Sequence, residues 1–375
     1  MNSNNNNNMH SKLYLLYKPN NIIVIYNTLI HTLMIIISLL SISYFKNSIL
    51  SLITIPLNSL MMLRSLIIFH DCCHDSYSEC IMSNYLLSFY YGLFAFLNVN
   101  WKFIHKTHHL TNGHINNEYN YQFNETIQHI NFYKNLTPLH RQIYKIWKPF
   151  SYFATIIEIM LIQRFSIYGL MINSYITKSK SIITVPLWKI FFNDIISNYL
   201  LYKWIYNIYI NDIIYHYLIS CIIYGLLAIG IFHNQHTFNP SFVEREKLWN
   251  YEKSAINGSS IILVPYYLQY FTGNIQYHHL HHLNSKIPSY YVKKYHDDVK
   301  LYSNEFDNVV ILSIKQCFDN LKLVLYSEQQ KKYVTFDEAD KELINDKLIK
   351  DNNAINKKLQ SQLKKPTKYL IKKLI

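Results

Sequence analysis

The sequence predicts an all-α, multi-pass membrane protein with about four transmembrane helices in two hairpins and a cytosolic helical cap that carries three histidine clusters. Three observations lead to this fold class. Of the 375 residues, 50% are hydrophobic, and they gather in long blocks. Four of these blocks are long enough to cross the roughly 30 Å hydrocarbon core of a bilayer. The histidine clusters lie between the blocks and have helical spacing.

The four predicted spans lie in two pairs. Residues 22–43 contain no formal charge, and residues 48–69 carry only Arg64, near the end of the block. Two further blocks, 186–207 and 213–232, flank a short polar turn. Each block has about the 20 residues that a helix needs to cross a membrane. We therefore expect two transmembrane hairpins.

Two other apolar stretches are ambiguous by length. Residues 80–97 are uncharged and almost long enough to span, whereas residues 150–172 carry Glu158, Gln163 and Arg164 and resemble an interfacial helix. If the three histidine clusters share one site, they lie on one side of the bilayer, so 80–97 does not cross it. The second hairpin then returns the chain to that side, where both termini also lie. Nearly all Lys and Arg residues fall on this face, which the positive-inside rule makes cytosolic.

This organisation predicts three regions. Residues 1–21 form a disordered, Asn-rich N-terminal tail, residues 22–300 form the membrane domain, and residues 301–375 form a polar, lysine-rich cytosolic tail with some helix around 305–350. The tail carries no recognisable chemistry.

Charge and cysteine content exclude several classes of protein. The formal net charge of +13 lies mostly outside the apolar blocks, which favours a membrane surface as partner. No nucleic-acid motif is present, so nucleic acid is not an expected partner. The five cysteines include no CxxC pair, which argues against a disulfide framework and against a thiolate zinc site.

The three histidine clusters are HDCCH, HKTHH and the HHLHH that ends GNIQYHHLHH. The first has histidines four residues apart, and the other two repeat an i, i+3, i+4 pattern, so on a helix the rings of each cluster project to a common side. Imidazole is the commonest metal-binding side chain. One tetrahedral zinc ion needs four ligands, so eight imidazoles indicate two metals, with iron among the candidates. The candidate ligands are His70, His74, His105, His108, His109, His278, His281 and His282.

The segments around these clusters resemble the histidine boxes of integral-membrane fatty acid desaturases, most similar to the acyl-lipid type of bacteria and cyanobacteria. The matching segments, between about 55 and 300, are RSLIIFHDCCH, WKFIHKTHHLTN, QHTF, LWNYEKSAINGSS and GNIQYHHLHHLNSKIPSY. The resemblance implies an oxygen-dependent enzyme with two iron ions held by the eight box histidines. It adds His236 as a ninth ligand, with His233 the weaker candidate, and it implies no catalytic residue beyond the metal ligands.

The reaction that the resemblance implies is the insertion of a cis double bond into a fatty acyl chain, with O2 as co-substrate. The protein then has to hold the acyl chain, as an acyl-lipid or acyl-CoA, in a narrow apolar tunnel from which water is excluded. Residues 80–97 and 261–271 are candidate lining. The sequence contains no haem-binding HPGG motif, flavin fingerprint or iron–sulfur cysteines. We therefore expect a separate electron donor, either a b-type cytochrome or a ferredoxin.

Neighbouring residues receive secondary roles. His279 lies inside the third box at a position that varies in the family, so we expect it beside the ligands or at the surface. We expect His114 and His129 to be solvated loop residues. Asp71 and, less favoured, Asp75 could orient a ligand imidazole through a hydrogen bond. Cys73 replaces a glycine common in the family and enlarges the side chain beside the metals.

Two alternatives remain open. A membrane di-iron hydroxylase or ketolase would use the same scaffold, and a histidine-rich metal transporter would instead place ionisable groups near the middle of its spans. The last four residues, KKLI, resemble a cytosolic dilysine retrieval signal, which predicts the endoplasmic reticulum if the source is eukaryotic. Glycosylation patterns at Asn124, Asn135 and Asn257 fall on the predicted cytosolic face, so we expect them to be unmodified.

Overall fold

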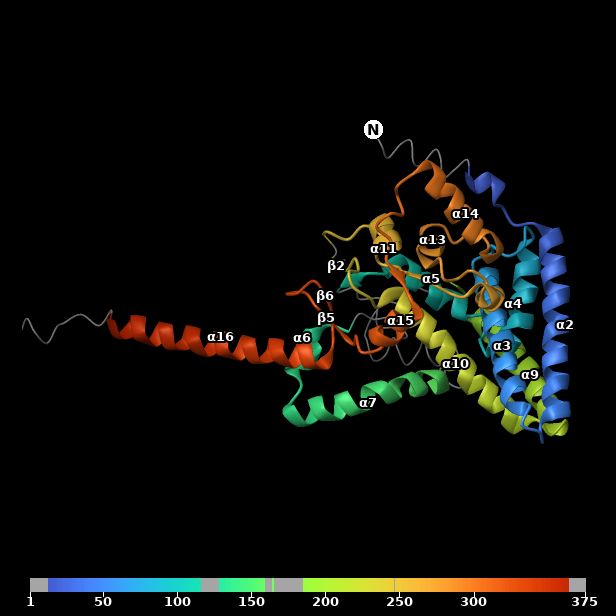
Figure 1. The fold of residues 1–375 in the computed structure, drawn as a ribbon, viewed down its shortest axis with the longest axis horizontal. Coiled ribbons are helices and arrows are strands. Elements are labelled where there is room, and N and C mark those ends of the chain that lie inside the picture. The colour runs from blue at the N-terminus through green and yellow to red at the C-terminus, as the bar shows by residue number, and fades with distance from the viewer. Residues whose placement is uncertain (1–12, 116–127, 159–163, 165–184, 246, 364–375) are drawn as a thin grey trace, which may run out of the picture.

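The structure is a computed structural model that describes residues 13–115, 128–158, 164, 185–245 and 247–363. Within these residues the chain is mostly helical, and its only sheets are three two-stranded ribbons (Figure 1). The helical fold class is therefore confirmed.

The helical bundle is built around α3 (Ser51–Cys73). This helix packs against α2 (Asn21–Phe45), α4 (Ile81–Ala95) and α10 (Ile214–His236), while α9 (Leu187–Ile210) packs against α4 and α10. The most apolar window of α3 is 72% buried within the protein, against 22% for α2 and 33% for α10. The outer helices therefore leave most of their apolar surface outside the protein, as helices that face lipid do.

Three helices in the described part of the chain are long and apolar enough to cross a membrane, namely α2, α3 and α10. The fourth predicted span, 186–207, forms the long helix α9, but this helix carries Lys189, Asp194 and Lys203 and is not among the three. The chain is thus membrane-associated, and the count of four spans stays a prediction. Helix α10 also continues beyond the predicted end at 232 to His236, which brings this histidine onto a span terminus.

After α4, the chain lies again beside the end of α3 that carries the first histidine cluster. It has 15 residues and ends at Phe96, whose left-handed conformation stops it. The next helix, α5 (Trp101–Thr111), begins with Trp101, whose ring lies 5.7 Å from that of Phe69 and 6.0 Å from that of His70. The second histidine cluster therefore starts beside the first.

The remaining elements lie around this end of the bundle, except the last helix, which extends away from it (Figure 1). Several of them lie in the region predicted as a polar tail, where Leu325 and Val334 are fully buried. Part of the predicted N-terminal tail is ordered too, since Tyr17 is buried and its hydroxyl donates to Asp298. These remaining elements are β1 (His114–Ile115), α6 (Ile130–Asn135), β2 (Glu244–Arg245), α11 (Tyr251–Asn257), β3 (Ile261–Ile262), η2 (Tyr266–Leu268), α12 (Gln269–Thr272), α13 (His278–Leu283), α14 (Ser289–Tyr302), β4 (Ile311–Leu312), α15 (Ile314–Asn320), β5 (Leu325–Ser327), β6 (Lys332–Val334) and the last helix, α16 (Phe336–Leu363).

Helix α7 (Pro138–Ile157) is amphipathic and includes the described start of the predicted interfacial segment 150–172. One face packs on the C-terminal region, where Lys145 pairs with Asp340 at 2.5 Å. The opposite face is apolar and exposed, as expected of a helix at a membrane surface. That face consists of Leu139, Ile143, Ile146, Trp147, Phe150, Phe153 and Ile157. Gln163 lies outside the described residues.

Candidate metal centre

The nine histidines singled out from the sequence lie in two groups. In each group the nitrogen atoms available to a metal lie within 4.8 Å of one another. The first group contains His70, His74, His105, His109 and His281, and the second contains His108, His236, His278 and His282. The two groups are adjacent, since the ring centroids of His109 in the first group and His282 in the second lie 4.3 Å apart. Helices α5 and α13 supply rings to both groups.

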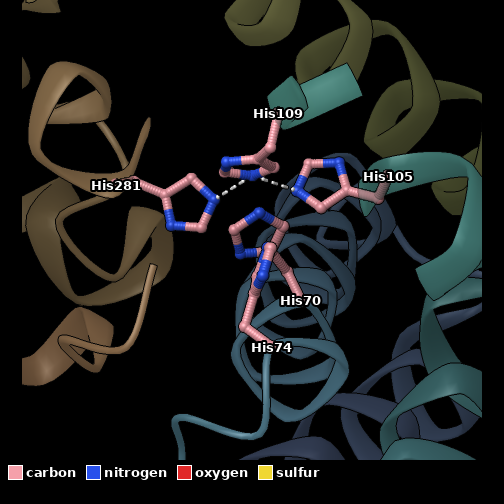
Figure 2. A group of neighbouring side chains, drawn as sticks. All are labelled: His70, His74, His105, His109 and His281. Carbon is pink, nitrogen blue, oxygen red and sulfur yellow. Dashed lines mark hydrogen bonds between the residues drawn. The ribbon is translucent and has the colours of Figure 1, made fainter. Parts of the chain in front are cut away.

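Figure 2 shows the first group, in which rings from three elements converge. The end of α3 carries His70 and His74, α5 carries His105 and His109, and α13 brings His281 from the opposite side. The Nε2 atom of His109 lies 2.8 Å from that of His281 and 3.0 Å from that of His105. A neutral imidazole nitrogen has either one hydrogen or one lone pair, so it cannot serve both neighbours as a donor. Lone pairs that converge in this way suit a cation.

The second group is completed by the end of α10. His236 Nε2 lies 2.9 Å from His278 Nε2, and His282 Nε2 lies 3.1 Å from His278 Nε2 and 3.0 Å from His108 Nε2. On its other side, His236 Nδ1 donates to the backbone carbonyl of Gly258 at 3.2 Å. Metal-bound histidines usually donate their second ring N–H to a carbonyl or carboxylate, which fixes the tautomer. The contact therefore leaves His236 Nε2 with a lone pair directed at the group.

Helix geometry assigns the rings to the groups. Residues four apart on a helix are separated by about 40° and residues three apart by about 60° in the opposite sense. In α5 the i, i+4 pair His105 and His109 enters the first group, and the i+3 ring of His108 enters the second. In α13 the pair His278 and His282 enters the second group, and His281 enters the first. Each i, i+3, i+4 cluster therefore serves both groups.

The electrostatics of the two groups fit metal binding. Burial, and then the neighbouring imidazoles, hold the pKa values of the rings in α5 and α13, and of His74, well below the usual value for histidine. Neutral imidazole is the form that binds a metal. The Nε2 atoms of His70 and His74 are buried and have no hydrogen-bond partner among the described residues. Buried polar atoms are normally satisfied, so these two nitrogens without partners are compatible with metal binding.

Asp71 has a different role from the one expected. Its Oδ1 atom is 3.7 Å from His70 Nδ1, which is too long for a hydrogen bond. Its Oδ2 atom instead accepts a hydrogen bond from the backbone N–H of Ser289 at 2.7 Å. Nearby, Lys286 Nζ donates to the carbonyl of His74 at 2.7 Å. These contacts join the first box to the loop that follows the third box. Asp75 is exposed, in a left-handed turn.

A polar network that the sequence analysis missed holds the start of α5. Asp194 Oδ1 accepts hydrogen bonds from Asn98 Nδ2 at 2.6 Å and Asn100 Nδ2 at 2.8 Å. Asn193 Nδ2 donates to Asn100 Oδ1 at 2.8 Å, and Asn98 Nδ2 also contacts the carbonyl of Arg164 at 2.9 Å. The charge that lowers the hydropathy of α9 thus anchors the helix that carries the second box. Asn98 and Asn100 lie directly before that box, and this position was the feature of the sequence that could have revealed the network.

Four histidines that the sequence analysis considered beside the ligands stay outside the two groups. His233 contacts Tyr152 and the carbonyl of Asn320. The expectation that His114 and His129 are solvated was wrong: His114 is buried in β1 near Trp249, and His129 caps α6 and pairs with Glu328 at 3.0 Å. Short strands and caps give no periodic signal that would have placed them. His279 is fully buried, so it is not a surface residue.

His279→Ala should retain much of the activity that replacement of a neighbouring group member removes. The ring of His279 points away from both groups, with Nε2 3.1 Å from His296 Nδ1 and Phe306 packed against it. The substitution therefore costs packing and one hydrogen bond, lowering stability by about 1–3 kcal/mol, without removing a candidate ligand. Thermal unfolding and metal content of the purified variant check both parts. Loss of bound metal at unchanged stability would contradict this assignment.

Two adjacent groups of buried imidazoles on a helical, membrane-associated scaffold define a class of membrane proteins with a histidine-rich site compatible with metal binding. The chain belongs to the fatty acid desaturase family, whose model matches residues 47–310. It is 27% identical over 281 residues to a fatty acid desaturase of Bacillus subtilis (strain 168), which covers 73% of this chain and 74% of the relative. The chain is therefore an acyl-chain desaturase and, as such, an oxidoreductase.

Proposed function

We propose that the chain binds two iron ions through its nine clustered histidines and uses O2 to insert a cis double bond into a fatty acyl chain. The first ion would be held by His70, His74, His105, His109 and His281, and the second by His108, His236, His278 and His282. The observation that carries the proposal is the separation of these residues, and no others in the described chain, into two adjacent groups of three or more potential ligands. When bound, the iron ions would supply the oxidising power for removing two hydrogens from adjacent methylenes.

The residues of the chain would contribute by holding the acyl chain in position and by excluding water from the site. All nine rings except those of His74, His108 and His236 are buried, and these three are half-buried. A site that excludes water protects a strong oxidant from side reactions and fixes the reacting carbons. Of the two candidate tunnel linings, 80–97 contributes Tyr91 and Phe96 to the core beside α3. The segment 261–271 is divided, because Ile261 and Ile262 are buried whereas Leu263, Tyr266 and Tyr267 are exposed.

Electrons would come from a separate reduced protein, a b-type cytochrome or a ferredoxin, because the sequence carries no motif for a haem, flavin or iron–sulfur cluster. The substrate would be an acyl-lipid or an acyl-CoA that enters from the bilayer. We place the histidine groups and both termini on the cytosolic face. Glycosylation at Asn135 or Asn257 would contradict that orientation; Asn124 lies outside the described residues.

The last four residues bear on which membrane the enzyme resides in. The predicted retrieval signal at Lys372 and Lys373 lies outside the described residues. The relative comes from a bacterium, which argues against the endoplasmic reticulum. Location there stays a prediction that replacement of both lysines by Ser would test in a eukaryotic host, by release of the enzyme to later secretory membranes.

Metal removal and restoration test the proposed cofactor. Chelation of the purified enzyme should abolish desaturation, and Fe²⁺ with a reductant and O2 should restore it, whereas Zn²⁺ should occupy the histidines without restoring activity, since it has no redox chemistry. Activity is measured from product formed with a reduced donor protein, and bound metal is measured by elemental analysis. Restoration by Zn²⁺, or full activity without O2, would rule out the iron mechanism.

A further inference from the structure

Arg64 lies in the bundle on a different face of α3 from the histidine groups. It precedes His70 by six residues, which turns it about 120° around the helix axis from that ring. Its side chain is only 6% exposed, and Nε has no hydrogen-bond partner among the described residues. No carboxylate in that part of the chain pairs with it. A buried, unpaired cation inside a span is costly and therefore marks a functional site.

The surroundings of Arg64 hold its guanidinium in place. The guanidinium carbon lies 5.2 Å from the ring centroid of Tyr270, a cation–π contact. Gly273 ends α12 at φ 52° directly beside it, and a Cβ atom there would lie 2.3 Å from Arg64 Nη1 and 2.8 Å from Ile67 Cγ2. Glycine is thus required where α12 closes over the cation. These contacts fix the side chain without neutralising its charge.

Three other buried polar residues, His31, Tyr77 and Tyr91, form a cluster of rings that reaches the cation through Tyr270. The ring of His31 is 5.8 Å from that of Tyr91 and 6.4 Å from that of Tyr270, and Tyr77 and Tyr91 are 6.4 Å apart. The hydroxyls of Tyr77 and Tyr91 lie near the Thr28 hydroxyl but make no hydrogen bond of normal geometry with a described residue, although both tyrosines are fully buried. The cluster therefore offers a guanidinium and two hydroxyl groups as donors, from α3, from α4 and from the loop before α4.

The tautomer of His31 can be assigned from its neighbour. The Ser65 hydroxyl donates to the carbonyl of Met61 at 3.0 Å, so its oxygen accepts from His31 Nε2 at 2.9 Å. His31 Nδ1 then carries a lone pair when the ring is neutral. Neutral His31 therefore supplies no positive charge to an anion, and Arg64 is the cation of the cluster.

We propose that Arg64, with the hydroxyls of Tyr77 and Tyr91, binds the oxyanion of a lipid head group between α2, α3 and α12. An oxyanion matches donors on several sides, and guanidinium binds carboxylate and phosphate in the same planar geometry. A lipid is indicated because α2 leaves most of its apolar surface outside the protein and Tyr270, over the cation, is 38% exposed. The oxyanion is the carboxylate of a fatty acid or the phosphate of a phospholipid. The site does not depend on the proposed iron chemistry.

Binding of three probes to the purified, detergent-solubilised chain tests the site: palmitate, its uncharged methyl ester, and dioleoyl phosphatidate. One of the two anionic probes, palmitate or phosphatidate, should bind at the site. Arg64→Gln should weaken binding of that probe roughly 10- to 150-fold, and Tyr91→Phe should weaken it roughly 2- to 10-fold. Neither should change methyl palmitate binding. Lys46→Gln is the matched control, because it also removes one positive charge, from an exposed pair with Asp212 outside the cluster.

The outcomes separate the sources of the oxyanion. Selective loss of palmitate binding assigns a carboxylate, and selective loss of phosphatidate binding assigns a phosphate. Thermal unfolding and metal content establish that each variant is folded, and if Arg64→Gln does not fold, Tyr91→Phe decides, because it keeps the ring. Anionic-probe affinities of the folded variants equal to those of Lys46→Gln would overturn the proposal.

Discussion

His281→Ala and His108→Ala should each reduce desaturation to background while the chain still inserts into the membrane. Both residues lie outside the candidate spans, and each belongs to a different histidine group. Removing one imidazole from a group takes away a proposed ligand and leaves the other group unchanged. We therefore expect iron content to fall from about two ions to about one per chain in either variant.

The control for these variants is His279→Ala, which alters the same helix as His281 and an equally buried ring. Fatty acid analysis of a host without a background desaturase measures activity, and membrane fractionation measures insertion. Wild-type levels of product from His281→Ala or His108→Ala would remove that residue from the metal site.

Gly258→Ala should cost roughly 10- to 100-fold in activity through the second histidine group. An added Cβ atom would lie 2.5 Å from the backbone oxygen of Ser254 and 3.2 Å from that of Phe242. Backbone atoms cannot rotate aside as a side chain can, so the turn after α11 has to move. The carbonyl of Gly258 accepts the hydrogen bond that orients His236. A shift of this turn therefore misaligns a proposed ligand.

Gly230→Ala provides the matched control for this prediction. Gly230 lies on α10, as His236 does, but a Cβ atom there would meet nothing within 4 Å. The variant should keep wild-type iron content and activity, because alanine also favours a helix. Equal iron content and activity in Gly258→Ala and Gly230→Ala would show that the carbonyl of Gly258 does not position His236.

Much of the site was predictable from local spacing. Helical periodicity put the rings of each cluster on one side, and the resemblance to a known family added His236. The division into two groups was not foreseen, although it follows from the angle between i+3 and i+4 rings, because it also requires knowing that α5 and α13 face each other.

Long-range contacts account for the remaining differences. Nothing local connects Asn98 and Asn100 with Asp194, about ninety residues later, yet their hydrogen bonds explain why a charge is present in α9. The buried positions of His114 and Tyr17 likewise depend on partners far along the chain. Composition predicted three helices that are long and apolar enough to cross a membrane, because length and hydropathy are local properties. It predicted the C-terminal region less well, because the short ribbon of β5 and β6 has little periodicity.

The fatty acid profile of a desaturase-deficient host that expresses this chain tests the central claim most directly. The account predicts new fatty acids with one additional cis double bond, formed only in the presence of O2 and absent with His281→Ala. Hydroxylated fatty acids without a new double bond, or an unchanged profile from membrane-inserted, iron-loaded protein with a reduced donor, would contradict it.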